Sequence, residues 1–87
     1  MEEIRKVVCK LMDKKKMISS MESCTGGYFV NEVTNVPGAS EILKFSAVTY
    51  SNEFKIKMGV SPKVIEEYSV YSMETAIEMS KNISKFS

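Results

Sequence analysis

The sequence contains no histidine and only two cysteines, and both features restrict the chemistry that the chain can perform. Cys9 and Cys24 do not form a C-x-x-C pair, and without histidine they leave no plausible zinc-binding set. We therefore predict no metal site and no cofactor. A nucleophilic side chain in this protein would also need a base other than histidine.

Long apolar runs and a strong excess of one charge are also missing. The 12 basic and 11 acidic residues of the 87-residue chain nearly balance, so nothing predicts a nucleic-acid or membrane-surface partner. No apolar stretch is long enough for a signal peptide or a membrane span, which predicts a cytoplasmic protein with two free thiols. No repeat, linker or low-complexity segment divides the chain, so we expect residues 1–87 to form one domain or part of one.

Apolar periodicity and turn residues predict an α/β domain with few strands and several helices. Strands are expected over 17–21 and 45–50. Helical segments are expected over 2–14, 25–35, 39–43, 52–58, 62–68 and from 73 onward. Ser51 or Asn52, Ser61 and Ser72 are the predicted N-caps, and Gly59 follows a helix as its C′ residue.

The densest set of reactive groups lies in Met21-Glu22-Ser23-Cys24-Thr25-Gly26-Gly27, between a predicted strand and a predicted helix. Such a junction would aim Ser23 at the free backbone N–H groups of the first helical turn, which stabilise developing negative charge. Ser23 is therefore the candidate nucleophile. Cys24 is an alternative nucleophile, although we expect it to be a buried packing residue. A helix N-cap at Ser23 or Thr25, followed by a tight glycine turn, is a purely structural interpretation.

The second predicted strand-to-helix junction is Tyr50-Ser51-Asn52-Glu53-Phe54-Lys55. Because junctions at the same edge of a sheet face one another, it is expected to approach Ser23. A lysine whose pKa is lowered by burial or a neighbouring donor replaces histidine as the base of a serine nucleophile, which makes Lys55 the candidate base. We expect Tyr50 to hydrogen-bond Lys55 or relay a proton, and Thr25 to orient Ser23. A solvated helix lysine is the alternative interpretation of Lys55.

Four motifs, taken together, resemble the C-terminal domain of the CinA family, the nicotinamide-nucleotide amidohydrolases. In chain order they are Glu22 to Gly27, Thr34 to Ser40, Tyr50 to Lys55 with Met58-Gly59-Val60, and Val70 to Met79. Their order and spacing match the family over nearly the whole chain.

The resemblance implies a three-layer α/β/α sandwich that hydrolyses the carboxamide of nicotinamide mononucleotide, or a related small molecule, and releases ammonia. It implies that Ser23 is the nucleophile, Lys55 the base and Tyr50 its neighbour. The substrate-binding residues that it implies are Thr25, Gly26, Gly27 and, more weakly, Asn52.

The family domain continues past the motifs matched here, with further strands and a Thr-Gly-x-Ala-Gly-Pro-x-Gly loop that helps build the substrate pocket. The resemblance therefore covers the N-terminal half of that domain. A sheet with only the two predicted strands has long unpaired edges, so we expect a homo-oligomer or a complementing chain. The alternative function is a truncated, non-catalytic module that serves in oligomerisation or nucleotide binding.

Overall fold

The computed structural model describes residues 2–87, so that residue 1 of the predicted domain lies outside the described residues. In chain order the elements are α1 (Glu2–Lys14), β1 (Ile18–Glu22), α2 (Tyr28–Thr34), the 3₁₀ turn η1 (Ala39–Glu41), β2 (Leu43–Val48), α3 (Asn52–Lys57), α4 (Pro62–Tyr68) and α5 (Met73–Phe86). Their order and types confirm the α/β prediction.

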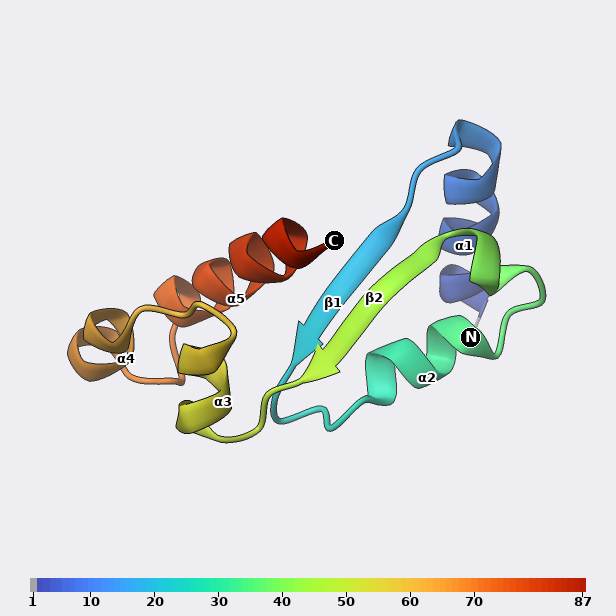
Figure 1. Cartoon of the computed structure of the whole chain (residues 1–87). Helices are drawn as coiled ribbons and strands as arrows, with labels where there is room; N and C mark the ends of the chain where they lie inside the picture. The colour runs from blue at the N-terminus through green and yellow to red at the C-terminus, as the bar shows by residue number, and fades with distance from the viewer. Residues whose placement is uncertain (1) are drawn as a thin grey trace.

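The sheet consists of β1 and β2, which pair in parallel. The register runs from Ile18 opposite Leu43 to Glu22 opposite Val48, with one irregularity between Ile18 and Ser19. Figure 1 shows α5 on one side of the strands and α1 and α2 on the other. The described residues therefore form the three layers of an α/β/α sandwich around a narrow sheet.

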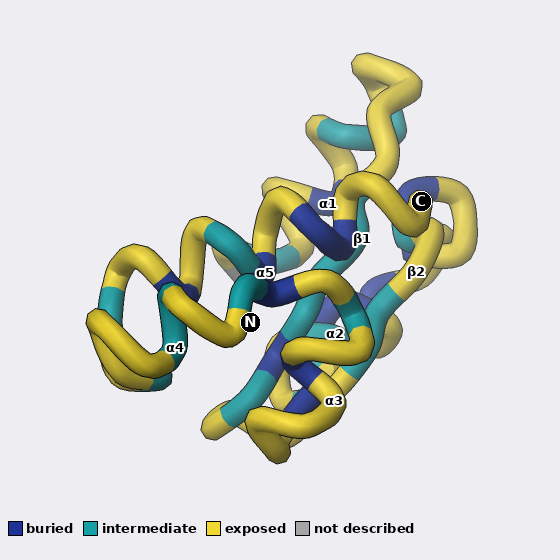
Figure 2. The backbone as a smooth tube through the Cα atoms, turned by 60° about the vertical axis from the view of Figure 1, so that its left-hand side comes forward, coloured by how far each residue is buried: buried dark blue, intermediate teal, exposed yellow. Residues whose placement is uncertain are grey.

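The main hydrophobic core lies between α1, α2, η1 and the start of the strands. Its buried members are Val8, Val33, Val36, Ala39 and Ile42. On the other side of the sheet, α5 contributes Met79 and Ile83, which are 9% and 3% exposed. Figure 2 shows that buried segments are short and that most of the chain is exposed or half-buried. Among the described residues, the outer edge of each strand has no partner strand.

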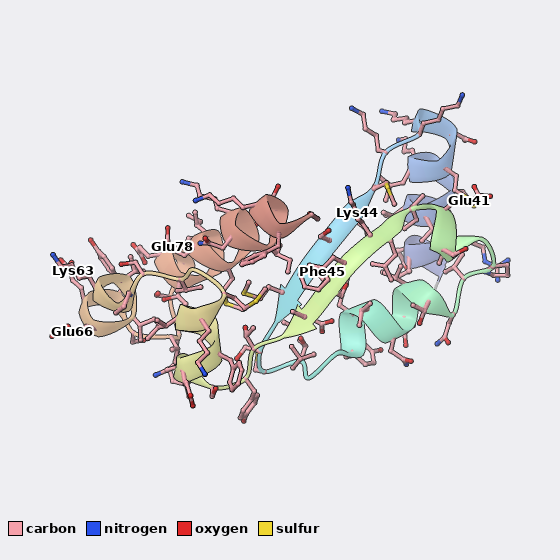
Figure 3. The ribbon with its side chains drawn as sticks, in the orientation of Figure 1. Glu41, Lys44, Phe45, Lys63, Glu66 and Glu78 are labelled. Atoms are coloured by element: carbon pink, nitrogen blue, oxygen red, sulfur yellow. The ribbon has the colours of Figure 1, made fainter. Side chains whose placement is uncertain are left out.

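Polar contacts with α5 hold the segment that follows α3. Gly59 has a φ of 103°, and a Cβ at this position would collide with the Asn82 side chain. Asn82 is 8% exposed, and its Nδ2 donates a hydrogen bond to the Glu78 carbonyl at 2.7 Å. The Glu78 side chain, labelled on α5 in Figure 3, accepts a hydrogen bond from the Ser61 backbone N–H at 3.1 Å. The path of the chain between α3 and α4 therefore depends on α5.

The turn between β1 and α2 is longer than predicted. Gly26 and Gly27 have φ angles of 59° and 98°, in the left-handed region that favours glycine. The glycines therefore form the turn itself, and α2 begins at Tyr28 instead of near Thr25. Gly27 occupies the N-cap position and has no side chain to satisfy the first N–H groups of the helix.

Glu22 supplies the missing cap from the end of β1. Its carboxylate accepts hydrogen bonds from the backbone N–H groups of Phe29 and Val30, both at 3.0 Å, and from Thr25 Oγ1 at 2.6 Å. Burial by itself would raise the pKa of Glu22, but these hydrogen bonds, with one from the Gly27 backbone, outweigh burial and hold the pKa below its ordinary value of 4.5. The negative charge also matches the positive end of the helix.

The packing of Gly59 can be tested with alanine. Gly59→Ala should lower the free energy of unfolding by about 2–4 kcal/mol, because it adds backbone strain and a collision with a buried side chain. Gly26→Ala is the matched control, since its φ is 59° and nothing lies within 4 Å of the added Cβ. This control should lose only about 1–2 kcal/mol. Denaturant unfolding measures both, and equal losses would contradict the close approach of Gly59 to Asn82.

The cap at Glu22 predicts a pH dependence of stability. Glu22→Gln should lower the free energy of unfolding at neutral pH by about 2 kcal/mol, because an amide is a weaker acceptor for these donors. Since the pKa of Glu22 is lower in the folded state, its contribution is present above about pH 4.5 and is lost as pH falls through the lowered folded value.

Unfolding midpoints measured from neutral to acidic pH check this expectation, and the variant should lack this part of the acid-dependent loss. Glu53→Gln is a control, because the Glu53 side chain is 67% exposed and its ion pair among residues 2–87 is a surface pair with Lys57 at 3.3 Å. If Glu22→Gln loses stability with acid as steeply as the wild type, the cap is not the source of the dependence.

Candidate active site

Lys55 and Ser23 meet at the C-terminal ends of the two parallel strands. Lys55 Nζ donates a hydrogen bond to Ser23 Oγ at 2.8 Å. It also donates to the main-chain carbonyl oxygens of Thr49 at 2.6 Å and Tyr50 at 3.1 Å. Lys55 is only 2% exposed, which excludes the interpretation of a solvated helix lysine.

Local hydrogen bonds place Lys55 in this position. Ser51 caps α3, as predicted, and its Oγ accepts a hydrogen bond from the Phe54 backbone N–H at 3.2 Å. At the other end of α3, the Val60 backbone N–H donates to the Lys55 carbonyl at 3.0 Å. The short helix is therefore held at both ends, and Lys55 is its buried residue.

The surroundings of Lys55 favour its neutral form. Burial lowers the pKa of Lys55 from its ordinary value of 10.5, and the neighbouring Cys24 opposes this effect more weakly. None of the described carboxylates forms an ion pair with Lys55. A neutral amine has two N–H groups and one lone pair, so the two carbonyl oxygens can take the N–H groups while the lone pair faces the Ser23 hydroxyl. In this form Lys55 can accept the proton of Ser23.

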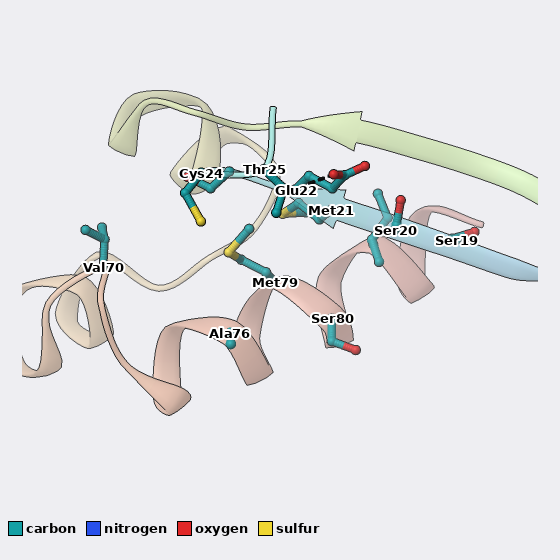
Figure 4. Close-up of a pocket in the computed structure, with 12 residues that line it drawn as sticks. Ser19, Ser20, Met21, Glu22, Cys24, Thr25, Val70, Ala76, Met79 and Ser80 are labelled. Carbon is teal, nitrogen blue, oxygen red and sulfur yellow. Dashed lines mark hydrogen bonds between the residues drawn. The ribbon is translucent and has the colours of Figure 1, made fainter. Parts of the chain in front are cut away.

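Ser23 borders a cavity of about 420 Å³ between the end of β1 and α5. Figure 4 shows its two walls, with Met79 projecting from α5 toward the end of β1. Val70 and Ala76 extend the apolar wall, whereas Thr25 and Cys24 belong to the opposite side. A small molecule in this cavity would therefore contact hydroxyl and thiol groups on one side and apolar groups on the other.

Cys24 departs from the expectation of a buried packing residue. It is exposed, lines the same cavity as Ser23 and forms no disulfide. Cys9 is also a free and exposed thiol. The prediction that Cys24 is a buried packing residue is therefore wrong. Of the two candidate nucleophiles, Ser23 is the one whose side chain forms a hydrogen bond with the Lys55 amine.

Two of the predicted site residues, Tyr50 and Asn52, do not line the cavity beside Ser23. Tyr50 is 74% exposed and meets Lys55 through its carbonyl oxygen. Asn52 is exposed at the start of α3 and is not among the residues that line the cavity of Ser23. A proton relay through the Tyr50 hydroxyl and a substrate contact by Asn52 stay predictions.

The helix α2 does not offer the free N–H groups that the sequence predicts. Those of Phe29 and Val30 already donate to Glu22, and the Thr25 hydroxyl also donates to Glu22 and not to Ser23. The backbone N–H groups of Cys24 and Thr25 have no acceptor among the described residues. These two unpaired N–H groups lie in the turn directly after Ser23, and Gly26 and Gly27 shape that turn from outside the cavity.

Sequence reasoning missed the roles of Glu22 and Thr49. One signal pointed to Glu22: the helix after Gly27 has no capping side chain and no acid in its first turn, so its cap must come from elsewhere. Nothing marked Thr49, because it contributes a main-chain carbonyl oxygen. Its own hydroxyl is buried and has no partner among the described residues.

The described residues contain no group of three or more side chains that could hold a metal ion. No helix in the described part of the chain is long and apolar enough to cross a membrane.

Two relatives with similar sequences carry the same name. The putative competence-damage inducible protein of Clostridium perfringens is 46% identical over 84 residues, which are 94% of this chain and 20% of the relative. Its namesake from Alkaliphilus metalliredigens is 45% identical over 86 residues, 98% of this chain and 20% of the relative. The chain thus spans about a fifth of the length of these proteins.

Solved structures show the same fold over a longer chain. The competence/damage inducible protein CihA from Agrobacterium tumefaciens superposes with a TM-score of 0.94 at 29% identity, covering 98% of this chain and 52% of that one. A CinA superfamily protein from Escherichia coli superposes at 0.93 with 24% identity, covering 97% and 49%, which shows the fold alone. The family model of the CinA C-terminal domain matches residues 2–87, and the chain therefore belongs to the CinA C-terminal domain family.

Proposed function

We propose that this chain carries the nucleophile and the base of a site that hydrolyses the carboxamide of nicotinamide mononucleotide or a closely related small molecule. The observation that carries the proposal is the 2.8 Å contact between Lys55 Nζ and Ser23 Oγ. A buried lysine without a carboxylate partner among the described residues is suited to accept a proton from a serine. The motifs around Ser23 and Lys55 support the substrate class.

In the first step, Ser23 Oγ attacks the carboxamide carbon while its proton passes to Lys55 Nζ. The carbonyl π bond becomes an oxyanion, for which we propose the unpaired backbone N–H groups of Cys24 and Thr25 as hydrogen-bond donors. The carbon–nitrogen bond then breaks. The proton held by Lys55 goes to the departing nitrogen, so that ammonia and an ester of Ser23 are the products of this half-reaction.

In the second step, water attacks the ester carbon and gives a proton to Lys55. The bond to Ser23 Oγ breaks, and the proton returns from Lys55 to that oxygen, which regenerates the pair and releases the carboxylate. The Thr49 and Tyr50 carbonyl oxygens keep Lys55 in place through both steps. They also stabilise the transient ammonium form, because each accepts one of its N–H groups.

The remaining parts of the proposal concern binding and location. Thr25 lines the cavity and is proposed as a substrate contact. Gly26, Gly27 and Asn52 do not line the cavity and are kept in the proposal as further substrate-binding residues. A cytoplasmic location belongs to the proposal, since two exposed free thiols suit a reducing compartment.

A second candidate function is a non-catalytic module of the same fold, for oligomerisation or nucleotide binding. The observation that favours it is coverage, since the chain corresponds to about half of the solved CinA structures. The two functions differ in one measurable product, because only the amidohydrolase releases ammonia.

Ammonia release from nicotinamide mononucleotide tests the proposal. Ser23→Ala should lower the rate at least about 10³-fold, and Lys55→Ala about 10²–10⁴-fold, because these changes remove the nucleophile and the base. Lys57→Ala is the matched control, since this lysine of α3 has a 60% exposed side chain whose contacts are to Glu53 and the Phe54 ring of the same helix and not to Ser23. It should keep the wild-type rate.

The pH profile gives a second readout in the same assay. The rate of the wild type should rise with pH through the lowered pKa of Lys55, because only the neutral amine accepts the serine proton. An intact, folded chain that releases no ammonia would refute the amidohydrolase and favour the non-catalytic module. A Ser23→Ala variant with the wild-type rate would refute Ser23 as the nucleophile.

A further inference from the structure

We propose that Ser69 is a positioning residue, whose strained backbone keeps Val70 in the apolar wall of the cavity beside Ser23. The position of Val70 follows from the hydrogen bonds around Ser69. Its contact with the ring of a carboxamide substrate rests on the proposed function.

The backbone of Ser69 has a conformation that residues with a side chain rarely adopt. Ser69 directly follows α4 and has a φ of 69° and a ψ of 169°. This region is almost confined to glycine, and any other residue is held there at a cost in conformational energy. Lys15 is the other non-glycine residue with a positive φ among residues 2–87, and it directly follows α1, where such an angle is common. The surroundings of Ser69 must therefore maintain its conformation.

Hydrogen bonds engage every polar group of Ser69. Its backbone N–H donates to the Ile65 carbonyl at 2.9 Å, and its hydroxyl accepts from the Tyr71 backbone N–H at 3.0 Å. Its carbonyl oxygen accepts from Ser72 Oγ at 2.8 Å and from Thr75 Oγ1 at 2.7 Å. Thr75 is fully buried in the first turn of α5. These contacts offset the strain, because the change of angles that relieves it would also break them.

The conformation of Ser69 determines where Val70 lies. Val70 is half-buried and lines the cavity of Ser23, whereas the next residue, Tyr71, is 93% exposed. Among the described residues that line this cavity, Val70 is the one from the connection between α4 and α5. Figure 4 shows Val70 at the end of the cavity where Cys24 lies. A change in the backbone angles of Ser69 would redirect this short connection and withdraw Val70 from the wall.

The apolar wall is suited to the ring of an aromatic carboxamide. Ala76 and Met79 are three residues apart on α5, so both face the cavity. Ala76 is small and leaves room for a flat ring beside the larger side chains of Val70 and Met79. A ring packed against this wall would direct its carboxamide toward Ser23 on the opposite side. Val70 would then add to substrate affinity, since its contact removes apolar ring surface from water.

Two substitutions at Ser69 separate the strain from the loss of its hydroxyl. Ser69→Gly and Ser69→Ala both remove the acceptor of the Tyr71 N–H, but only glycine adopts these backbone angles freely. The glycine variant should therefore unfold at a higher denaturant concentration than the alanine variant. The control is Lys81, an exposed residue inside α5, where the order should reverse because alanine is the better helix former. A Ser69→Ala variant at least as stable as Ser69→Gly would refute the strain.

The hydroxyl of Thr75 tests whether the hydrogen bonds hold Val70. Thr75→Val keeps the shape of the buried side chain but removes its bond to the Ser69 carbonyl, so the Val70 methyl signals in NMR spectra should broaden or split. Thr75→Ser keeps the hydroxyl and should give one sharp set. Adding Ser69→Gly to Thr75→Val should restore one sharp set, because glycine needs no support at these angles. The methyl signals of Val8, in the core on the other side of the sheet, are the internal reference.

Kinetics with nicotinamide mononucleotide test the contact with the substrate. Val70→Ala should raise KM about tenfold and change kcat less than about twofold, because the wall contacts bound substrate and transition state alike. Thr75→Val should also raise KM, and adding Ser69→Gly should reverse this rise. Tyr71→Ala is the matched control, since its exposed side chain does not line the cavity, and it should keep the wild-type values.

Each contrary result overturns a separate part of the inference. One sharp set of Val70 methyl signals in a folded Thr75→Val variant would refute Ser69 as a positioning residue. If Thr75→Val does not fold, the stability order at Ser69 and the signals of the double variant decide instead. An unchanged KM in Val70→Ala would refute the substrate contact. A chain that releases no ammonia would refute the proposed function, while the unfolding and NMR results would still show whether Ser69 positions Val70.

Discussion

The buried amine of Lys55 is the interaction on which the arrangement of the site depends. It contacts two main-chain carbonyl oxygens after β2 and the hydroxyl of Ser23 after β1, so one side chain joins both strand ends to α3. A buried ammonium group without an anionic partner is costly, which favours the neutral amine. In the neutral form, the two carbonyl contacts that hold Lys55 in place would also direct its lone pair at Ser23.

The N-terminus of α2 shows how a neighbouring carboxylate changes the chemistry of a turn. Glu22 takes the N–H groups of Phe29 and Val30, which would otherwise attract a substrate oxygen. In the proposed mechanism, the donors that stabilise the oxyanion are therefore those of the turn between Ser23 and the glycines. Glu22 thus has a structural role in this account, whereas Ser23 and Lys55 form the proposed catalytic pair.

Local patterns were enough to predict much of the fold, and long-range contacts account for what they missed. Apolar spacing and the caps at Ser51 and Ser72 predicted where helices begin, because these signals act within a few residues. The start of α2 was misplaced, since left-handed glycines and a carboxylate seven residues before Phe29 determine it. Lys55 and Ser23 were predicted as partners because both follow strands. The carbonyl of Thr49 was not, since every residue type carries that group.

The central claim is that Lys55 is a base and not a structural cation. An NMR titration of its side-chain amine measures this most directly in the folded chain. The account predicts a midpoint below the ordinary 10.5, because burial without an anionic partner disfavours the charged form. A midpoint at or above 10.5 would contradict the account, since Lys55 would then be an ammonium group that cannot accept the proton of Ser23.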